Sequence, residues 1–305
     1  MYDTLQIRRA YTEQEREILE DFFTNELVPE TDVKYLKGYK GRSIRSSYAN
    51  WTFYLGPTNF KIVGSLTTAS KKNNLYNTTF EDIKKATDEL QKLFCLDLGN
   101  ANIIRLDIAY NFIMEHPVFN YHNFLLCPEK FKQTKHEDET LQFANQNVTY
   151  KFYDKVKESA KNKKLPKTYN KMNILRYEMS LKSKGIKEIF HRKLVFSDLQ
   201  DELIYLDFVN AWFDQYLNVP KRKNHNLPTI DYAGIKAYKD FAVKYLLNSP
   251  EGVDFTQSFL ADKNTTAKAR HDIKNYIEQL NFGKPISNPI EDELFNKVKG
   301  AYSKA

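Results

Sequence analysis

The chain has 305 residues, of which 41% are hydrophobic and 28% charged, and its 46 Lys and Arg against 39 Asp and Glu give a formal net charge of +7. This composition is typical of a globular protein and excludes a disordered or fibrous chain. The sequence contains no run that approaches the ~18 consecutive apolar residues of a membrane span. Its first residues also lack the basic segment and the apolar run of a signal peptide. We therefore expect a cytoplasmic protein with no membrane partner.

Hydrophobic periodicity predicts both helices and strands over the first two-thirds of the chain. Apolar residues at helical spacing predict helices over residues 12–27 and 79–94. Alternation and turn residues predict two hairpins and two single strands, over residues 51–66, 140–156, 102–112 and 173–182. We therefore expect a domain over residues 1–195 that is built on a largely antiparallel β-sheet flanked by helices.

After about residue 195 the pattern becomes helical, over residues 199–216, 232–247, 254–261 and 264–280. We expect an all-helical domain over residues 196–305, which makes the whole chain α+β. The last three helices have the order of a helix-turn-helix, in which Asn264 caps the last helix and Lys268 and Arg270 contact DNA. The alternative is a small bundle that braces the first domain or contacts a second copy of the chain.

The positive charge is unevenly distributed. Residues 196–305 carry 14 basic and 15 acidic residues, a net charge of −1, whereas the remaining residues carry 32 and 24, a net charge of +8. The basic excess therefore lies in the first part, where a polyanion such as nucleic acid would bind. An excess of this size also occurs in proteins that bind no polyanion.

Several common catalytic motifs are absent. The sequence contains no P-loop, no Gly-x-Gly-x-x-Gly and no Gly-x-Ser-x-Gly, and its six histidines show neither His-x-x-x-His nor His-x-His spacing. The two cysteines, Cys95 and Cys127, are too few for a disulfide framework or a cysteine-based zinc site. These absences exclude P-loop NTPases, dinucleotide enzymes, zincins and the nickases whose metal is held by paired histidines.

Three predicted strands each have one apolar and one polar face, because side chains alternate along a strand. Their polar faces carry Arg105 and Asp107, then Lys151, Tyr153 and Lys155, and finally Arg176 and Glu178. Two carboxylates, a phenol and several cations on one surface suit phosphodiester chemistry, because carboxylate oxygens bind Mg²⁺ or Mn²⁺ and a phenol can act as a covalent nucleophile. The alternative is a solvated sheet face with salt bridges between strands.

A lysine-rich segment surrounds the candidate nucleophile. Residues 151–171 contain eight lysines, namely Lys151, Lys155, Lys157, Lys161, Lys163, Lys164, Lys167 and Lys171. The acidic residues of this segment are Asp154 and Glu158. Cations at this density would suit a phosphate backbone, although a solvated loop can have the same composition.

These motifs, in this order, resemble those of the rolling-circle replication initiators of filamentous phages, the gene II type, and more distantly those of plasmid initiators of the Rep_trans type. Arg105-Leu106-Asp107 resembles the Arg-hydrophobic-Asp strand of the family. Tyr153-Asp154-Lys155-Val156-Lys157-Glu158 resembles its Tyr-x-Lys-x-x-Glu motif, and Arg176-Tyr177-Glu178 resembles its Arg-aromatic-Glu strand. Where the family tends to have Gly-Asn, this sequence has Lys72-Asn73-Asn74.

The resemblance implies a metal-dependent nicking and joining enzyme. Such an initiator binds a double-stranded origin, cuts one strand with its tyrosine, here Tyr153, and leaves a free 3′-OH for a host polymerase. A second strand transfer then releases a single-stranded circle. The implied partners are origin DNA, single-stranded DNA, a host helicase and a host polymerase, and a homodimer is compatible with this function.

The expected roles in such a site follow from charge and chemistry. Lys151 and Lys155 would favour the phenolate of Tyr153, and Arg105 and Arg176 would neutralise charge on the pentacoordinate phosphate. The expected ligands of Mg²⁺ or Mn²⁺ are Asp107 and Glu178, with Glu158 as a third ligand or a proton acceptor. The lysines expected to bind DNA are Lys151, Lys157, Lys161, Lys163, Lys164 and Lys167.

Alternatives remain at this point. Tyr169 is the alternative nucleophile, because Tyr150 and Tyr177 should face the core. The sequence also leaves open a non-catalytic initiator that binds an origin and recruits a helicase, and a structural or single-strand-binding phage protein.

Overall fold

The computed structural model describes the chain except for residues 27–33, 39–40, 138, 163–164, 223, 226–234, 248, 263, 281–284 and 287–288. Lys163 and Lys164, two of the lysines expected to bind DNA, therefore lie outside the described residues. In the part of the chain that is described, none of the helices combines the length and the apolar character that a membrane crossing requires.

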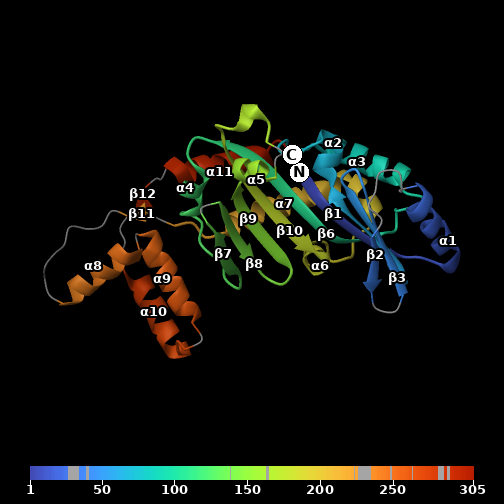
Figure 1. The fold of residues 1–305 in the computed structure, drawn as a ribbon. Helices are drawn as coiled ribbons and strands as arrows, with labels where there is room; N and C mark the ends of the chain where they lie inside the picture. The colour runs from blue at the N-terminus through green and yellow to red at the C-terminus, as the bar shows by residue number, and fades with distance from the viewer. Residues whose placement is uncertain are drawn as a thin grey trace.

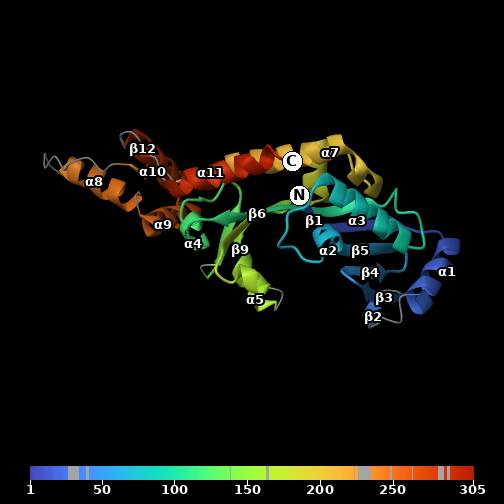
Figure 2. The ribbon, with the colours of Figure 1, turned by 90° about the horizontal axis from the view of Figure 1, so that it is seen from above.

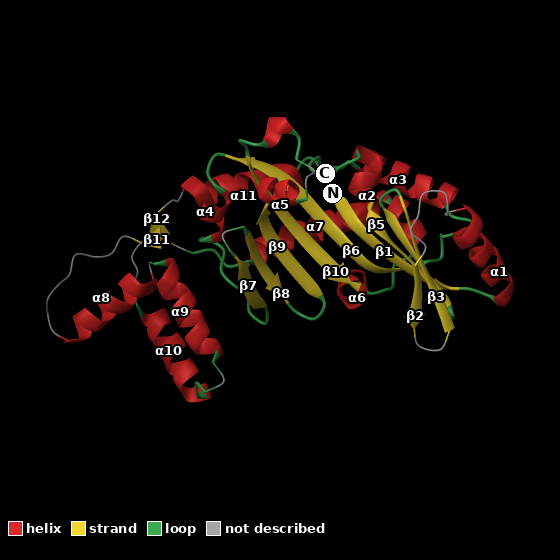
Figure 3. Cartoon of the chain, viewed as in Figure 1, coloured by secondary structure: helices red, strands yellow, loops and turns green. Residues whose placement is uncertain are grey.

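The centre of the structure is a ten-stranded sheet in which every neighbouring pair is antiparallel. Its strands are β1 (Tyr2–Ala10), β2 (Lys34–Gly38), β3 (Gly41–Tyr48), β4 (Trp51–Leu55), β5 (Asn59–Ser65), β6 (Asn102–Met114), β7 (Lys132–His136), β8 (Thr140–Ala144), β9 (Val148–Asp154) and β10 (Asn173–Lys182). Their spatial order is β2-β3-β4-β5-β1-β6-β10-β9-β8-β7 (Figure 3). With its helices, this sheet confirms the expected α+β class.

The helices are α1 (Glu13–Asp21), α2 (Leu66–Lys71), α3 (Phe80–Leu93), α4 (Val118–His122), α5 (Lys155–Lys161), α6 (Ser183–Phe190), α7 (Glu202–Asn218), α8 (Ile235–Leu247), α9 (Pro250–Ala261), α10 (Ala267–Gln279) and α11 (Pro289–Tyr302). Thr12 and Thr79 begin α1 and α3 with capping boxes, which satisfy backbone N–H groups at the helix start. Asn264 is not the cap of α10, as the sequence had suggested; the hydroxyl of Thr266 accepts the hydrogen bond from the Ala269 N–H, so the helix begins later.

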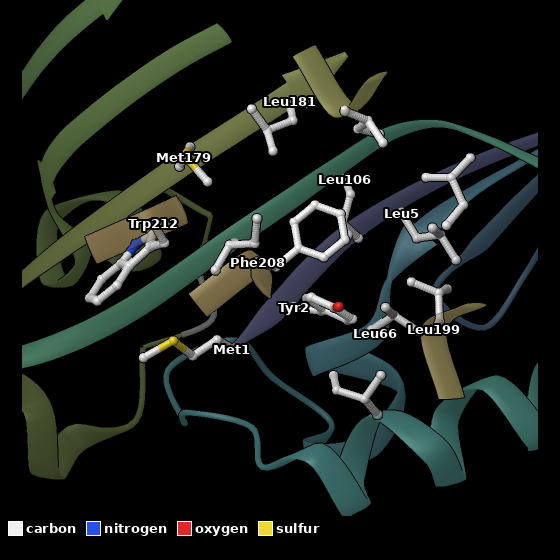
Figure 4. Close-up of a cluster of buried hydrophobic side chains, with 14 of the residues drawn as sticks. Met1, Tyr2, Leu5, Leu66, Leu106, Met179, Leu181, Leu199, Phe208 and Trp212 are labelled. Carbon is white, nitrogen blue, oxygen red and sulfur yellow. The ribbon is translucent and has the colours of Figure 1, made fainter. Parts of the chain in front are cut away.

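The apolar face of the sheet is covered by helices. Figure 2 shows α7 and α11 along one face of the sheet and α5 on the opposite side. Tyr2 from β1, Leu106 from β6 and Phe208 from α7 lie together in the core (Figure 4), and the rings of Tyr2 and Phe208 are 5.4 Å apart. The core thus continues from the sheet into helices beyond residue 195, while α8, α9 and α10 lie to one side (Figure 1). The division into two domains stays a prediction.

The hairpin of β4 and β5 shows why one glycine is needed. Trp51 lies directly opposite Gly64 in the register of the two strands. A Cβ atom at Gly64 would lie 2.2 Å from a ring carbon of Trp51 and 2.8 Å from the Asn50 carbonyl oxygen. Only a residue without a side chain therefore lets this indole pack on the sheet. The next residue, Ser65, caps α2.

Candidate functional site

The polar faces of β6, β10 and β9 form one continuous surface. In the register of β10 and β9, Arg176 lies opposite Tyr153 and Glu178 lies opposite Lys151. On the other side of β10, Ser180 lies opposite Asp107. The structure therefore brings the predicted polar residues of the three strands together on one face.

This surface is not the solvated sheet face of the alternative interpretation. Asp107, Arg176 and Glu178 are only 1%, 2% and 7% exposed. Buried charges are retained only when they are paired and hydrogen-bonded. The side chains around them must therefore supply those partners.

Tyr153 is held by a carboxylate. Its hydroxyl donates to Oε2 of Glu178 at 3.3 Å. Burial raises the pKa of the Tyr153 phenol well above its usual range, the positive charge of Arg176 lowers it, and the negative charge of Glu178 raises it further. The phenol is therefore neutral and donates its proton towards Glu178.

Lys155 is placed differently from the sequence-based expectation. β9 ends at Asp154, whose carboxylate accepts hydrogen bonds from the Val156 and Lys157 N–H groups at 3.0 Å and so begins α5. Lys155 is thus the first residue of a helix and not part of the strand alternation. Its side chain is fully buried, its Nζ lies 5.7 Å from the centre of the Tyr153 ring, and it donates to Glu158 at 2.6 Å.

Asp107 is paired with Arg105 on its own strand. Nε and Nη2 of Arg105 donate to the two oxygens of Asp107 at 2.8 and 2.6 Å, and Nη2 also donates to the hydroxyl of Ser180 at 3.3 Å. Burial raises the pKa of Asp107, Arg105 opposes this shift, and the charge of Glu178 adds to it. The charge of Glu178 thus disfavours the charged form of Asp107.

The three expected metal ligands have separate partners. Besides Tyr153, Glu178 pairs with Lys151 at 3.3 Å and with Nε of Arg176 at 3.6 Å. Glu158 pairs with Lys155 and accepts a hydrogen bond from Asn162 at 2.8 Å.

Within the described ranges, Glu115, His116 and Glu293 form a group whose possible metal-ligand atoms all lie within 4.8 Å of one another. The three expected carboxylates do not form such a group among these residues. Asp107 and Glu178 are diagonal neighbours on adjacent strands. Diagonal neighbours of an antiparallel pair are about 7–8 Å apart.

Sequence reasoning missed Asp3, which holds Arg176 in place. Nη2 of Arg176 donates to Oδ2 of Asp3, and Nη1 donates to the Asn111 side chain at 3.1 Å and to the Asn74 carbonyl at 3.2 Å. Burial alone would raise the pKa of Asp3, but Arg176 and the Ser65 hydroxyl hold it below its usual value. The alternation of Leu5-Gln6-Ile7-Arg8 indicates a strand here, but Tyr2-Asp3-Thr4 does not continue it, because the register is irregular between Tyr2 and Leu5.

A pocket of about 380 Å³ lies next to this site. It is lined by Thr68, Lys72, Asn73, Asn74, Glu158, Ser159 and Asn162. Lys72 ends α2 with a φ of 64°, the left-handed conformation that glycine adopts without strain. Within Lys72-Asn73-Asn74, Lys72 is thus the residue with a glycine-like backbone.

The predicted DNA-binding cations differ in their surroundings. Lys157, Lys161 and Lys167 are exposed, and Lys161 pairs with Glu139 at 2.5 Å. Lys268 is also exposed. Nη2 of Arg270, in contrast, donates to the Asp262 carbonyl at 2.7 Å and braces the turn between α9 and α10.

The structure also describes the two tyrosines expected in the core, Tyr150 and Tyr177, and the alternative nucleophile, Tyr169. Tyr150 and Tyr177 are buried, as expected. The hydroxyl of Tyr150 donates to Gln215 at 2.6 Å and that of Tyr177 to the Trp212 carbonyl at 3.2 Å. Tyr169 is partly exposed, and its ring lies 6.5 Å from that of Tyr76. Both core hydroxyls are therefore committed to structural hydrogen bonds.

The sequence matches one protein-family model, described as the N-terminal part of the replication-associated protein of gene II. The match covers residues 61–215, slightly more than half of the chain. This range includes β6, β9, β10 and α5, but not Asp3. A search of curated proteins found no match.

Proposed function

The chain belongs to the family of gene II-type replication-associated proteins, which are initiators of rolling-circle DNA replication, and we propose that it cuts one strand of an origin with Tyr153. The observation that carries this proposal is the hydrogen bond from Tyr153 to the buried carboxylate of Glu178. A neutral phenol needs a base to become a nucleophile. The neighbouring carboxylate can supply that base.

The proposed step is a transesterification. The Tyr153 oxygen attacks the phosphorus and forms a phosphotyrosine bond to the 5′ side of the nick. The bond to the 3′ oxygen breaks, and that oxygen takes up a proton from water and becomes the free 3′-OH. Oε2 of Glu178 receives the phenol proton, because it is the acceptor at 3.3 Å. Asp3 acts as a positioning residue, since it fixes the guanidinium of Arg176 opposite Tyr153.

Asp107 and Glu178 are the proposed ligands of Mg²⁺ or Mn²⁺. The donor set fits a hard divalent cation, because two buried carboxylates lie on adjacent strands and the charge of Glu178 disfavours the charged form of Asp107. When bound, the ion polarises a phosphoryl oxygen and stabilises the departing 3′ oxygen. Glu158 stays a predicted third ligand, and it would have to leave Lys155 to act as one.

We expect Asp107→Asn to abolish metal-dependent cleavage without lowering the melting temperature in metal-free buffer. The folded-state pKa of Asp107 is raised, so its contribution to stability is present at low pH and is lost as the pH rises through that pKa. At neutral pH the burial of the charged carboxylate offsets its pairing with Arg105, and Arg105 is 34% exposed and can turn to water, so a neutral amide should be tolerated. Calorimetry with and without Mg²⁺ measures this.

The wild-type melting temperature should rise with Mg²⁺ and that of Asp107→Asn should not, because ligand binding stabilises the folded state. Glu178→Gln should likewise lose both cleavage and the Mg²⁺-dependent rise. If Asp107 instead only supported Arg105, Asp107→Asn would melt earlier in metal-free buffer and would keep residual cleavage. That result would remove the metal site from the proposal.

A second expected result concerns the lysine-rich segment. Changing Lys161, Lys163 and Lys164 together to Ala should weaken DNA binding equally for all sequences. The slope of log affinity against log salt should fall by about one unit for each lost phosphate contact. Fluorescence anisotropy with a labelled duplex at several salt concentrations measures the slope.

The matched control removes three exposed cations elsewhere, through Lys85→Gln, Lys92→Gln and Lys187→Gln on α3 and α6. We call it the α3/α6 control variant. Its slope should equal that of the wild type. If the lysine-segment variant also keeps the wild-type slope, that segment is an ordinary solvated loop.

A further inference from the structure

A row of cations crosses the half of the sheet that lies away from Tyr153. In register, Arg8 of β1 lies opposite Lys61 of β5, Lys61 lies opposite Tyr54 of β4, and Tyr54 lies opposite Arg45 of β3. We call these four residues the Arg8–Arg45 row. Its strands are neighbours in the sheet (Figure 2), so the row runs across four consecutive strands.

The row belongs to the face of the sheet that is turned away from the core. Along β1 and β4, its residues alternate with the buried side chains of Ile7, Phe53 and Leu55. Arg8 and Arg45 are exposed, and Lys61 is partly exposed. Gln6, next to Arg8 on this face, lies opposite Arg105 of β6, so the row continues the polar surface of the candidate site.

The cations of the row gather around one aromatic ring. Nζ of Lys61 lies 4.1 Å from the centre of the Tyr54 ring, and the guanidinium carbon of Arg45 lies 5.7 Å from it. Burial lowers the pKa of Lys61, and the neighbouring charge of Arg8 lowers it further. The positive charges therefore lie close enough to repel one another.

Acidic residues are scarce in this half of the sheet. The strands β1, β3, β4 and β5 contain one, Asp3, and it is committed to Arg176. Among the described residues, no ion pair joins Arg8, Arg45 or Lys61 to a carboxylate. Like charges directly opposite each other destabilise a sheet. The repulsion between these cations therefore lowers the stability of the fold, and an anionic ligand would remove that repulsion.

We propose that the Arg8–Arg45 row binds the phosphate backbone of the duplex DNA that flanks the cleavage point, a proposal that rests on the proposed function. Cations without carboxylate partners are what a polyanion requires. Single-stranded DNA usually needs several free aromatic rings for stacking. Tyr54 is the aromatic residue that β1, β3, β4 and β5 direct to this face, and two cations already contact its ring.

The position of the row sets where the contacted DNA lies. Asn111 of β6 is opposite Arg176, which is itself opposite Tyr153, whereas Asn102 of β6 is opposite Arg8. Asn111 and Asn102 are nine residues apart along β6, which corresponds to about 30 Å at ~3.3 Å per residue. The row is therefore displaced along the strand direction from Tyr153, and β6 and β10 lie between its nearest strand, β1, and β9.

The test removes the three charges of the row together, through Arg8→Gln, Lys61→Gln and Arg45→Gln in the full chain. Binding to a labelled 30-base-pair duplex of arbitrary sequence is measured by anisotropy at several salt concentrations without divalent ions. We expect the salt slope to fall by roughly two to three units, since each phosphate contact contributes about 0.9. The α3/α6 control variant should keep the wild-type slope. The row variant should melt no earlier than the wild type, because the repulsion is gone.

A slope in the row variant equal to that of the control would overturn the proposal. So would a fall confined to a labelled 30-nucleotide single strand, since the row would then bind single-stranded DNA. Failure of the proposed function is distinguishable, because cleavage is scored separately from binding. A reduced slope in a protein that never forms a covalent adduct would support the row and overturn only the role of Tyr153.

Discussion

Replacing Tyr153 by phenylalanine is expected to abolish the covalent protein–DNA adduct and to slow strand cleavage by at least about a thousandfold. The change removes the nucleophilic oxygen and keeps the ring that packs beside Lys155. It also removes one hydrogen bond to Glu178, which keeps Lys151 as a partner. DNA binding and the melting temperature should therefore stay close to those of the wild type.

The measurement uses supercoiled DNA with Mg²⁺ or Mn²⁺, and an SDS gel that detects DNA-linked protein. Tyr169→Phe is the matched control, because it removes the hydroxyl of a partly exposed tyrosine whose ring faces Tyr76. It should keep the adduct. If Tyr153→Phe still forms the adduct and Tyr169→Phe does not, then Tyr169 is the nucleophile and the assignment of Tyr153 is wrong. Loss of DNA binding in Tyr153→Phe would instead indicate a structural role.

Asp3→Asn is expected to lower the free energy of unfolding by about 3–5 kcal/mol, which is the usual effect of removing one partner of a buried ion pair. Arg176 is 2% exposed and would lose its main carboxylate. Chemical denaturation at neutral pH measures the change. The control is Asp254→Asn, which breaks the 2.8 Å pair with Lys135, where the aspartate is 43% exposed. That change should cost at most about 1 kcal/mol.

The pH dependence gives a second check on Asp3. Its folded-state pKa is lowered, so its contribution is present above the unfolded-state pKa and is lost as the pH falls through the folded-state pKa. The difference between the wild type and Asp3→Asn should therefore shrink in acid. A difference below about 1 kcal/mol at neutral pH, or one that stays constant in acid, would contradict the pairing with Arg176.

The order of residues along β6, β9 and β10 was enough to predict which side chains share a face. Side chains alternate along a strand, so Asp107, Tyr153 and Glu178 could be assigned to the polar side before any pairing was known. The same argument failed for Lys155. The carboxylate of Asp154 satisfies the first N–H groups of α5, and this local hydrogen bonding ends the strand two residues earlier than the sequence predicted.

The pairing of the charges, in contrast, could be seen only once the strands were assembled into a sheet. Asp3 meets Arg176 across 173 residues of sequence because β1 inserts between β5 and β6, and no local pattern contains that strand order. The same insertion places Arg8 beside Lys61 and completes the row across β3, β4 and β5. Alternation along a strand is a property of neighbouring residues, whereas the partner of a charge depends on which strands the buried apolar face brings together.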